Sequence, residues 1–376
     1  MVWVFWICVI MIVYTYFGYP LLLLALTQCY RKRVQTGEFT PTVSVIIPYY
    51  NEERRIGRKL ENTLDLDYPH DRMELIAASD CSTDGSDDIV ASYAARGVKL
   101  VRLDQRRGKH HAQGHALSVV HGDIIVFTDA SILLPREAIR NIVRNFIDPV
   151  VGCVSSTDRV MAESQSVNTE GLYVRYDMFL RKRESLLGST SGMSGSFYAA
   201  RRELCDDWIP NMSNDFYLPL QSVMRGYRAI LDPRAVGYYT LVGTHRQEFI
   251  RKVRTVVHGL QVMWRFRGIL NPLRYGWYSV QVLSHKLLRW LVPLFMGGVL
   301  MSNMFLLTRG LVYQEALAIQ SAFYAAAALG YVRPAWQRLF LVRVPYFLIV
   351  ANLSIVVAWG KYLSGERYVV WEPSRR

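Results

Sequence analysis

The chain has 376 residues, of which 51% are hydrophobic, and its formal net charge is +13. Such an apolar fraction exceeds that of one soluble domain but is too low for a bundle of membrane-spanning helices alone, so we expect a soluble domain joined to membrane segments. The absence of any recognisable nucleic-acid module argues against nucleic acid as the reason for the basic charge. The five cysteines have no CxxC or His-rich spacing, which indicates neither a disulfide scaffold nor a zinc site.

The first segment, residues 1–30, is predicted to span a membrane. It contains no charged residue, and Arg31, Lys32 and Arg33 follow it at once. An apolar stretch of about 25 residues with a basic stop is typical of a spanning helix. A cleaved signal peptide is the alternative, but the segment lacks a positively charged start and is too long. The positive-inside rule places the middle of the chain in the cytosol, as part of an integral protein of the plasma or inner membrane.

Residues 40–240 alternate short β-rich runs with helical patterns. We expect strands over 43–48, 74–79, 99–104 and 123–129, and helices over 53–66, 87–95 and about 110–120. Four parallel strands linked by helical crossovers predict an α/β domain with a Rossmann-like nucleotide-binding sheet. Ligands of such sheets bind beyond the carboxyl ends of the strands.

The ends of the first and second expected strands carry polar and aromatic residues. Tyr49 or Tyr50 could stack on a nucleotide base, and Glu52 could reach the base or the ribose. Asp80 could accept a hydrogen bond from a pyrimidine N–H. The alternative is that Asp80 and the nearby Asp84 only form a turn before a helix, because aspartates are common in turns and caps.

Asp129 ends the fourth expected strand, after a run that should be buried. An ionised carboxylate there is costly unless it meets a cation or hydrogen-bond donors. A divalent metal that bridges a diphosphate would supply that partner. The alternative is an N-cap for a helix that begins near Pro135.

Basic and small residues supply further candidates. Lys109 could reach a base or a phosphate, and the histidines that follow it are more simply polar loop and helix residues than metal ligands. Asp215 is the candidate general base, with a helix N-cap as its alternative. The small-residue stretch Gly192–Ser196 could let the backbone approach a sugar, although a plain turn is equally compatible.

The last third of the chain returns to the membrane. Residues 160–190 are expected to be helical and 244–286 to form amphipathic interface helices, because basic and aromatic residues are interleaved there. Three uncharged runs, 290–308, 316–332 and 344–360, predict about three spanning helices within 287–363, before a tail over 364–376. Four spans would put that basic tail outside, against the positive-inside rule. The segment near Glu315 is therefore the candidate for a re-entrant one.

Read together, these motifs resemble family 2 glycosyltransferases of the inverting, membrane-bound branch, which contains hyaluronan, chitin and cellulose synthases and bacterial exopolysaccharide glycosyltransferases. The resemblance covers about residues 40–270. It is carried by IIPYYNEE (46–53), SDCSTDGS (79–86), RRGKHHAQGHAL (106–117), VFTDAS (126–131), SGSFYAARREL (194–204) and SNDFYLPLQSVMRGYRAILDP (213–233). It implies a GT-A fold.

The resemblance also implies roles for single residues. Asp80 would contact uracil, Lys109 would help hold the nucleotide, Asp129 would lie at the metal and diphosphate, and Asp215 would be the catalytic base. Two departures matter: Ser131 replaces the second aspartate of the DxD motif, and QxxRW is missing, which leaves processivity open. The expected donor site comprises Pro48, Tyr49, Tyr50, Glu52, Asp80, Lys109, Asp129, Ala130, Ser131, Arg251 and Arg254, and the acceptor site comprises Ser194, Gly195, Ser196 and Asn214.

The sequence thus predicts a metal-dependent glycosyltransferase that uses Mg²⁺ or Mn²⁺ and a UDP-sugar. It would form a β-glycosidic bond to a membrane-associated acceptor: a growing polysaccharide, a lipid-linked oligosaccharide or a glycolipid. Expected partners are the bilayer and an export or assembly protein. The alternative is a catalytically silent scaffold or subunit of a polysaccharide synthesis or export complex.

Overall fold

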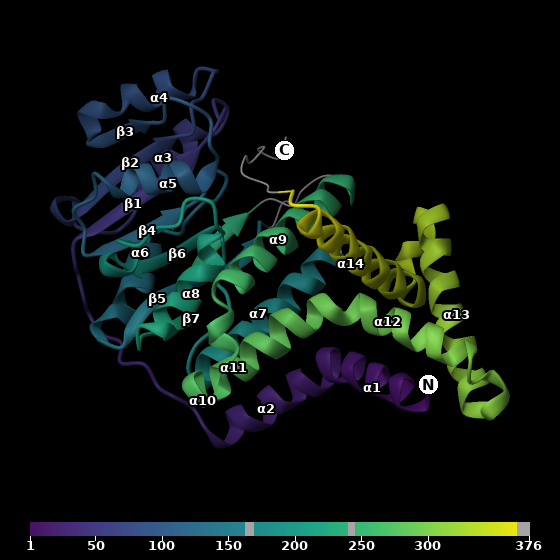
Figure 1. The fold of residues 1–376 in the computed structure, drawn as a ribbon. Helices are drawn as coiled ribbons and strands as arrows, with labels where there is room; N and C mark the ends of the chain where they lie inside the picture. The colour runs from purple at the N-terminus through teal and green to yellow at the C-terminus, as the bar shows by residue number, and fades with distance from the viewer. Residues whose placement is uncertain (162–168, 240–244, 367–376) are drawn as a thin grey trace.

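The computed structural model describes residues 1–161, 169–239 and 245–366. It consists of an α/β domain and a group of long helices that extends away from it (Figure 1). The expected helical region 160–190 and the expected tail 364–376 therefore lie partly outside the described residues.

The α/β domain is built on a seven-stranded sheet with the order β3-β2-β1-β4-β6-β5-β7. Strands β1 to β4 run parallel to one another, as the sequence predicts, and β6 runs antiparallel to both β4 and β5. The seven strands are β1 (Val43–Tyr49), β2 (Met73–Ser79), β3 (Val98–Arg102), β4 (Ile124–Thr128), β5 (Val151–Val160), β6 (Phe197–Arg201) and β7 (Arg228–Tyr239).

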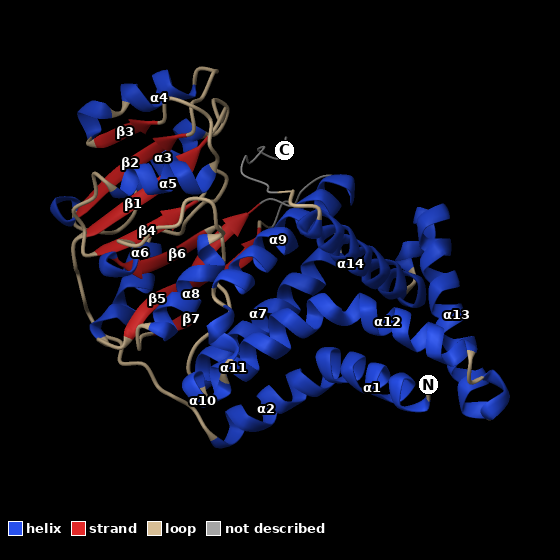
Figure 2. Ribbon diagram, in the orientation of Figure 1, coloured by secondary structure: helices blue, strands red, loops and turns tan. Residues whose placement is uncertain are grey.

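Helices cover both faces of this sheet (Figure 2). They are α3 (Ile56–Leu64), α4 (Ser86–Ser92), α5 (Lys109–Leu117), α6 (Ala138–Val143) and α8 (Asn214–Met224). Strand β1 is buried along its whole length, and successive residues point into two separate cores. Ile46 joins the core beneath α5 and α8, while Val45 joins Ile56 and Leu60 of α3 in the other. Because both faces of the sheet are buried, its strands appear in the sequence as continuous apolar runs.

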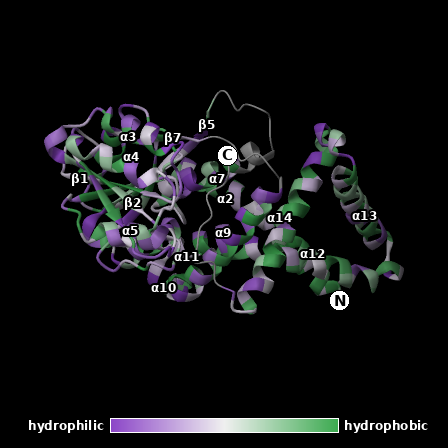
Figure 3. Ribbon diagram, turned by 90° about the horizontal axis from the view of Figure 1, so that it is seen from above, coloured by the Kyte–Doolittle hydropathy of each residue, from purple (hydrophilic) through white to green (hydrophobic). Residues whose placement is uncertain are grey.

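Among the described residues, three helices are long and apolar enough to cross a membrane: Val2–Cys29, Trp277–Met304 and Phe340–Leu363. The first joins α1 (Val2–Val13) to α2 (Tyr19–Cys29) through a π-helical turn, and the second joins α11 (Trp277–Val282) to α12 (Leu288–Met304) in the same way. The third is α14. Seen from above, α12 and α14 project away from the sheet as largely hydrophobic helices (Figure 3).

The second span begins at Trp277, before the sequence-based start at 290. His285, Lys286 and Arg289 interrupt the apolar run in the sequence, but the helix continues through them because they meet charged partners inside the protein. The expected interface segment 244–286 therefore ends within a candidate spanning helix.

The helix α13 (Leu311–Val332) has 22 residues, packs against α12 and α14, and is not among the three candidates. Its first turns carry Gln314 and Glu315. Two of the expected C-terminal spans thus have the required length and composition, whereas a crossing by α13 stays a prediction. With three crossings in the whole chain, the basic C-terminal tail would lie on the same side of the membrane as the α/β domain. The positive-inside rule favours this arrangement.

Between the sheet and the spans lie α7 (Thr169–Leu187), α9 (His245–Arg265) and the short α10 (Pro272–Tyr275) (Figure 1). Helix α7 packs on both α2 and β7, and α9 packs on α14. Helices α7 and α9 thus connect the α/β domain to the candidate spans, while an interfacial position stays a prediction.

Candidate active site

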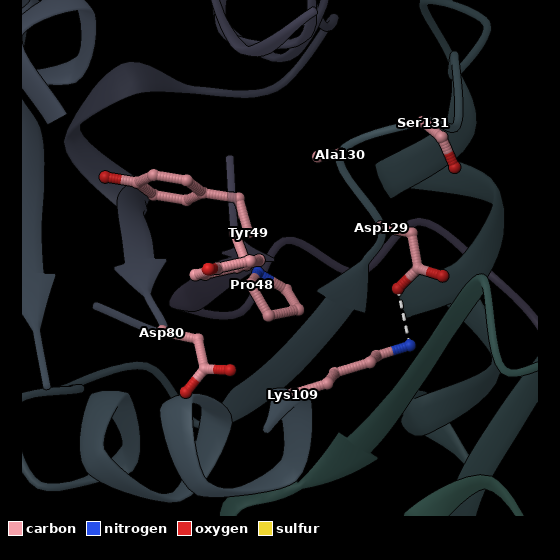
Figure 4. A pocket seen from close by; sticks show the side chains of 8 residues that line it. Pro48, Tyr49, Asp80, Lys109, Asp129, Ala130 and Ser131 are labelled. Carbon is pink, nitrogen blue, oxygen red and sulfur yellow. Dashed lines mark ion pairs between the residues drawn. The ribbon is translucent and has the colours of Figure 1, made fainter. Parts of the chain in front are cut away.

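A pocket opens at the carboxyl ends of β1, β2 and β4 (Figure 4). It encloses a solvent-open space of about 310 Å³. Strand β1 lies between β2 and β4 and is parallel to both, so the three strand ends meet at one edge of the sheet. The lining residues, all expected from the sequence at the donor site, are Pro48, Tyr49, Tyr50, Asp80, Lys109, Asp129, Ala130 and Ser131.

Asp80 follows β2, is 2% exposed, and accepts hydrogen bonds from two backbone amides. The amide of Arg107 donates to its Oδ1 at 2.7 Å, and that of Gly108 lies 2.9 Å from both oxygens. Burial raises the pKa of the Asp80 carboxyl, although these amides and Arg106 oppose the rise. Because a carboxylate has about four acceptor positions, Asp80 can still accept an N–H from a bound base.

The loops after β1 and β2 are held together by side-chain hydrogen bonds. Asn51, with a positive φ of 50°, donates from Nδ2 to the Thr83 hydroxyl at 3.2 Å, and its Oδ1 accepts from the Thr83 amide at 2.8 Å. Asp84 accepts from the amide of Ser86 at 3.0 Å, so for Asp84 the turn interpretation holds. These bonds fix the edge of the pocket near Tyr50.

Two tyrosines follow β1, and they have different surroundings. The hydroxyl of Tyr49 donates to Asp87 at 2.7 Å, and the residue is 1% exposed. Tyr50 is half-buried, and the guanidinium of Arg106 lies 3.8 Å from its ring centroid. Tyr50 is therefore the better placed of the two to stack on a base.

Lys109 is the first residue of α5 and follows Gly108, whose φ of 96° favours glycine. Its Nζ lies 2.5 Å from Oδ1 of Asp129 and donates to the carbonyl of Gly195 at 2.9 Å. Figure 4 shows this ion pair across the pocket. The ammonium thus joins the end of β4 to the loop before β6.

A buried lysine, Lys59 of α3, holds the segment that carries Asp129. Its Nζ donates to the Thr128 hydroxyl at 2.9 Å and to the Ile132 carbonyl at 2.7 Å, on either side of that segment. Burial lowers the pKa of Lys59 to about 7, while the nearby Asp129 opposes the fall. Lys59 belongs to none of the motifs. The sequence signal that could have found it is an isolated lysine on the apolar face of a predicted helix.

Asp129 is not a helix cap, so that alternative is wrong: the next helix, α6, begins at Ala138 with Glu137 as its N-cap. Among the described residues, no group of three or more His, Cys, Asp and Glu side chains could hold a metal ion. Asp129 and the neighbouring Ser131 both line the pocket. This pair fits instead a cation that takes most of its ligands from substrate phosphates and water.

Asp215 is the second residue of α8, and the N-cap is Ser213. The Ser213 hydroxyl donates to Asp215 Oδ1. A methyl group on Gly195 would lie 3.0 Å from Asp215 Oδ2, so the carboxylate faces the loop whose carbonyl binds Lys109. Asp215 does not line the pocket, but Gly195 and Lys109 connect it to the pocket wall.

The loop before β6 is held by a carboxylate that the sequence did not single out, Asp158 of β5. Its Oδ1 accepts from the hydroxyls of Ser194 at 2.6 Å and Ser196 at 2.7 Å. Burial raises the pKa of Asp158, and Asp129 adds to the rise. The amide of Asp129 donates to the carbonyl of Ser196 at 2.9 Å. Ser194 and Ser196 are thus fixed beside the pocket by hydrogen bonds.

Besides Asp215 and the loop residues 194–196, four expected site residues do not line the pocket. Glu52 is 5% exposed and pairs with Arg55 at 3.2 Å, and Asn214 is 1% exposed and donates to Gln113 of α5 at 2.9 Å. Both are held by protein partners, so contact with a substrate would require them to rearrange. Arg251 and Arg254 lie on α9.

Helix α9 approaches the site through His258, one turn after Arg254. The His258 ring lies 6.4 Å from the ring of His110, which follows Lys109. Burial lowers the pKa of His110 to about 3, with Lys109 and His258 adding to the fall. His110 is therefore neutral and cannot serve as a cation for phosphate.

Comparison with known proteins finds a family model that matches most of this domain. Residues 44–209 match the family model described as "Glycosyl transferase family 2". Curated relatives include a beta-monoglucosyldiacylglycerol synthase of Synechocystis, 26% identical over 172 residues, and a poly-beta-1,6-N-acetyl-D-glucosamine synthase of Staphylococcus epidermidis, 23% identical over 232 residues. These alignments cover 44% and 59% of this chain but 36% and 56% of the relatives, so the chain spans about a third to a half of their length.

One solved structure is similar along nearly the whole chain. It is a mannosyltransferase from Pyrobaculum calidifontis in complex with GDP-Man and Mn²⁺, with a TM-score of 0.74 and 25% identity. The match covers 97% of this chain and 100% of that one. The similarity therefore includes the long helices as well as the sheet.

Proposed function

We propose that this chain, which carries a glycosyltransferase domain of family 2, transfers a sugar from a nucleotide-sugar to an acceptor at the membrane surface. One observation carries the proposal: residues from three strand ends line a single pocket, and Asp215 reaches its wall through Gly195. The alternative, a catalytically silent scaffold, has no need of carboxylates gathered at one pocket.

The proposed reaction is one displacement at the anomeric carbon. The acceptor hydroxyl attacks that carbon, its proton passes to Asp215, and the bond from the anomeric carbon to the diphosphate oxygen breaks. The electron pair of the broken bond leaves with the nucleoside diphosphate. Attack from the opposite face inverts the centre, so an α-linked donor gives a β-linked product.

The leaving diphosphate needs positive charge. Lys109 supplies an ammonium at the pocket wall, held at 2.5 Å from Asp129 until a phosphate competes for it. A bound Mg²⁺ or Mn²⁺ would supply further charge neutralisation, with Asp129 and Ser131 as its protein ligands.

Asp80 and Tyr50 suit the nucleotide base. The free acceptor position of Asp80 fits the imino N–H of uracil, and we propose a UDP-sugar as the donor. Guanine also offers a ring N–H, and the mannosyltransferase that resembles the whole chain was obtained with GDP-Man. GDP-sugars are therefore the second donor class to test.

A lipid is the proposed acceptor. Only two of the helices after the α/β domain meet the length and composition of a span among the described residues, which is few for a polymer channel. One curated relative is named a beta-monoglucosyldiacylglycerol synthase, and that name supports a lipid acceptor. The other named relative makes a polymer, so a growing polysaccharide is the competing acceptor.

The first experiment incubates membranes that contain the protein with radiolabelled UDP- and GDP-sugars and extracts lipid and polymer fractions separately. We expect label from a UDP-sugar in the lipid fraction. Label in the polymer fraction would replace the acceptor assignment, and label from GDP-sugars alone would replace the donor. No transfer from any donor would favour the silent scaffold.

The second experiment tests the base with Asp215→Asn. A lost general base typically slows transfer by about 10²–10⁴-fold, and nucleotide binding should stay within about twofold because Asp215 lies outside the pocket lining. The exposed Asp71, remote in the turn before β2, provides the matched control Asp71→Asn, which should retain full activity. Unchanged transfer by Asp215→Asn would exclude the proposed base.

A further inference from the structure

The loop before β6 joins the donor side of the candidate site to the proposed base. On the donor side, the carbonyl of Gly195 accepts from Lys109 at 2.9 Å. The carbonyl of Ser196 accepts from the amide of Asp129 at 2.9 Å. On the other side, Gly195 faces the carboxylate of Asp215. This loop therefore contacts both the groups proposed to hold the diphosphate and the group proposed to take the proton.

Gly195 is the point where the loop and the base approach each other most closely. A methyl group at this position would lie 3.0 Å from Asp215 Oδ2 and 3.4 Å from its carboxyl carbon, which is tighter than ordinary contact. Two residues earlier, the amide of Met193 donates to the carbonyl of Asp215 at 2.8 Å. The loop therefore packs directly on the first turn of α8, and its position sets the separation between the base and the donor-side groups.

Both serine side chains of the loop turn toward one carboxylate oxygen of β5. The hydroxyl of Ser194 donates to Asp158 Oδ1 at 2.6 Å, and the hydroxyl of Ser196 donates to the same atom at 2.7 Å. The two hydroxyl oxygens lie 2.8 Å apart, and that of Ser194 also accepts from the amide of Ser196 at 3.3 Å. Because Gly195 lies between the two serines in the chain, Asp158 fixes it from both sides.

These hydrogen bonds tie the loop to the sheet. Asp158 belongs to β5 and pairs in register with Gly237 of β7. The amide of Ser194 donates to the hydroxyl of Ser155, also on β5, at 2.8 Å, and Ser194 is 1% exposed. A buried hydroxyl that loses its acceptor is costly, so the loop keeps one position while Asp158 is present. Support from a strand places a site residue more precisely than a loop does by itself.

Asp158 holds the loop through a single atom. Within the described residues, both of its hydrogen bonds are accepted by Oδ1. An asparagine at this position keeps that acceptor, because its side chain also carries a carbonyl oxygen, whereas an alanine removes it. The two substitutions therefore separate a role in hydrogen bonding from a role that requires the negative charge.

We propose that Asp158 is a positioning residue of the transfer reaction. By accepting from Ser194 and Ser196, it holds Gly195 between the donor-side groups and the base, so that the two halves of the site keep the separation that the displacement needs. This inference rests on the proposed function and adds to it a residue that acts through the loop. The physical reason is that reacting groups displaced by about 1 Å lose up to about 100-fold in rate.

The test measures kcat and KM in purified variants with the nucleotide-sugar that supports transfer. Asp158→Ala should lower kcat by about 10–100-fold, while KM for the donor stays within about twofold. Asp158→Asn should keep kcat within about threefold and leave its pH profile unchanged. A general base or a metal ligand would lose as much kcat in the asparagine variant as in the alanine variant, and that result would overturn the positioning role.

A second variant removes the same bonds from the loop. The double substitution Ser194→Ala/Ser196→Ala should lower kcat by a similar factor, and Asp158→Ala added to it should cost less than about threefold more. Losses that multiply independently would mean that Asp158 does not act through the serines. If Asp158→Ala fails to fold, the serine variant carries the test alone, and a kcat equal to that of the original protein would reject the inference.

The matched control is Asp123→Ala. Asp123 is exposed and accepts from the hydroxyl of Thr42 at 2.6 Å, just before β4 begins and at the end of that strand opposite to Asp129. The control loses the same kind of bond, from a hydroxyl to a carboxylate, and should keep the original kcat. An equal loss of kcat in Asp123→Ala and Asp158→Ala would indicate a general effect on the fold and count against the proposal.

Hydrogen exchange separates this inference from the function on which it rests. The amides of segment 193–196 should exchange about tenfold faster in Asp158→Ala than in the original protein, and at the original rate in Asp158→Asn. That pattern in a protein that transfers no sugar would reject the glycosyltransferase function and keep Asp158 as the residue that positions the loop. Sugar transfer by a protein in which Asp158→Ala changes neither kcat nor exchange would reject the inference alone.

Discussion

The pocket and a buried cluster both gather charged side chains, but they hold them differently. The cluster lies where α7 meets the second candidate span and consists of Asp177, Arg181, Glu184, His285 and Arg289. In the pocket, Lys109 and Asp129 stay 17% and 29% exposed and pair mainly with each other. In the cluster, Glu184 and His285 are fully buried, and Glu184 is bonded on every side. A site that exchanges substrates must keep its polar groups open, whereas a buried network stabilises the structure that surrounds it.

This difference predicts opposite consequences of substitution. Changes in the pocket should reduce activity with little effect on stability. Changes to the buried carboxylates of the cluster should destabilise the protein.

The largest effect is expected for Glu184→Ala. It leaves His285 and the hydroxyl of Tyr19 without their partner, and breaking a buried pair in this way costs about 3–5 kcal/mol. The melting temperature in detergent should fall by about 10 °C. The melting temperature of Glu184→Gln should fall less, because the amide oxygen can still accept a hydrogen bond.

The matched control for Glu184 is Glu61→Ala. Glu61 is 53% exposed and pairs with Arg96 at the surface, where such pairs are worth about 1 kcal/mol or less. Equal losses of stability in the Glu61 and Glu184 variants would contradict the expected difference between exposed and buried ion pairs.

The next effect concerns the pocket. Lys109→Met removes the ammonium between Asp129 and Gly195, and we expect kcat/KM for the nucleotide-sugar to fall about 10–100-fold, the worth of one charged hydrogen bond to phosphate. The melting temperature should change little. Lys99→Met removes a half-exposed lysine paired with Glu74 and should leave kcat/KM unchanged. A large loss of stability in Lys109→Met would make Lys109 a structural residue.

Lys59 should have the smallest effect on activity, but it gives stability a defined pH dependence. Its pKa falls to about 7 in the folded protein, so between about pH 7 and its unfolded value near 10.5 the unfolded chain binds more protons. Stability should therefore rise with pH across that window, by at most about 1.4 kcal/mol per pH unit.

Lys59→Met removes the titrating group and should flatten this slope, measured as the free energy of unfolding between pH 7 and 9. A slope that persists in Lys59→Met would assign it to another group. The same variant also loses the two bonds that bracket Asp129, so its KM for the donor should rise while the pocket residues are intact.

Much of the α/β domain could be predicted from the sequence. Strands β1 to β4 lie within a few residues of the expected ranges, and the polar residues at their ends line the pocket. The reason is that apolar runs define buried strands and that parallel strands bring their carboxyl ends to one edge. Antiparallel β6 and its position between β4 and β5 had no such local signal.

Individual side chains near the pocket were harder to predict. Glu52 and Asn214 carry the right chemistry in the right motifs, yet both are buried against protein partners. Asp158 and Lys59 lie close to Asp129 without belonging to any motif. Motifs identify segments, but which side of a segment faces the ligand depends on packing.

The sequence by itself determined the class of the protein: a basic, membrane-linked chain with an α/β nucleotide-binding domain and its chief carboxylates. Those properties follow from local patterns of hydrophobicity and from residues that are close in the chain. Only the tertiary structure decided that a helix carrying His285, Lys286 and Arg289 could continue as a candidate span, and that these charges face Asp177 and Glu184. The physical reason is that the cost of a buried charge depends on partners that lie far away in the sequence.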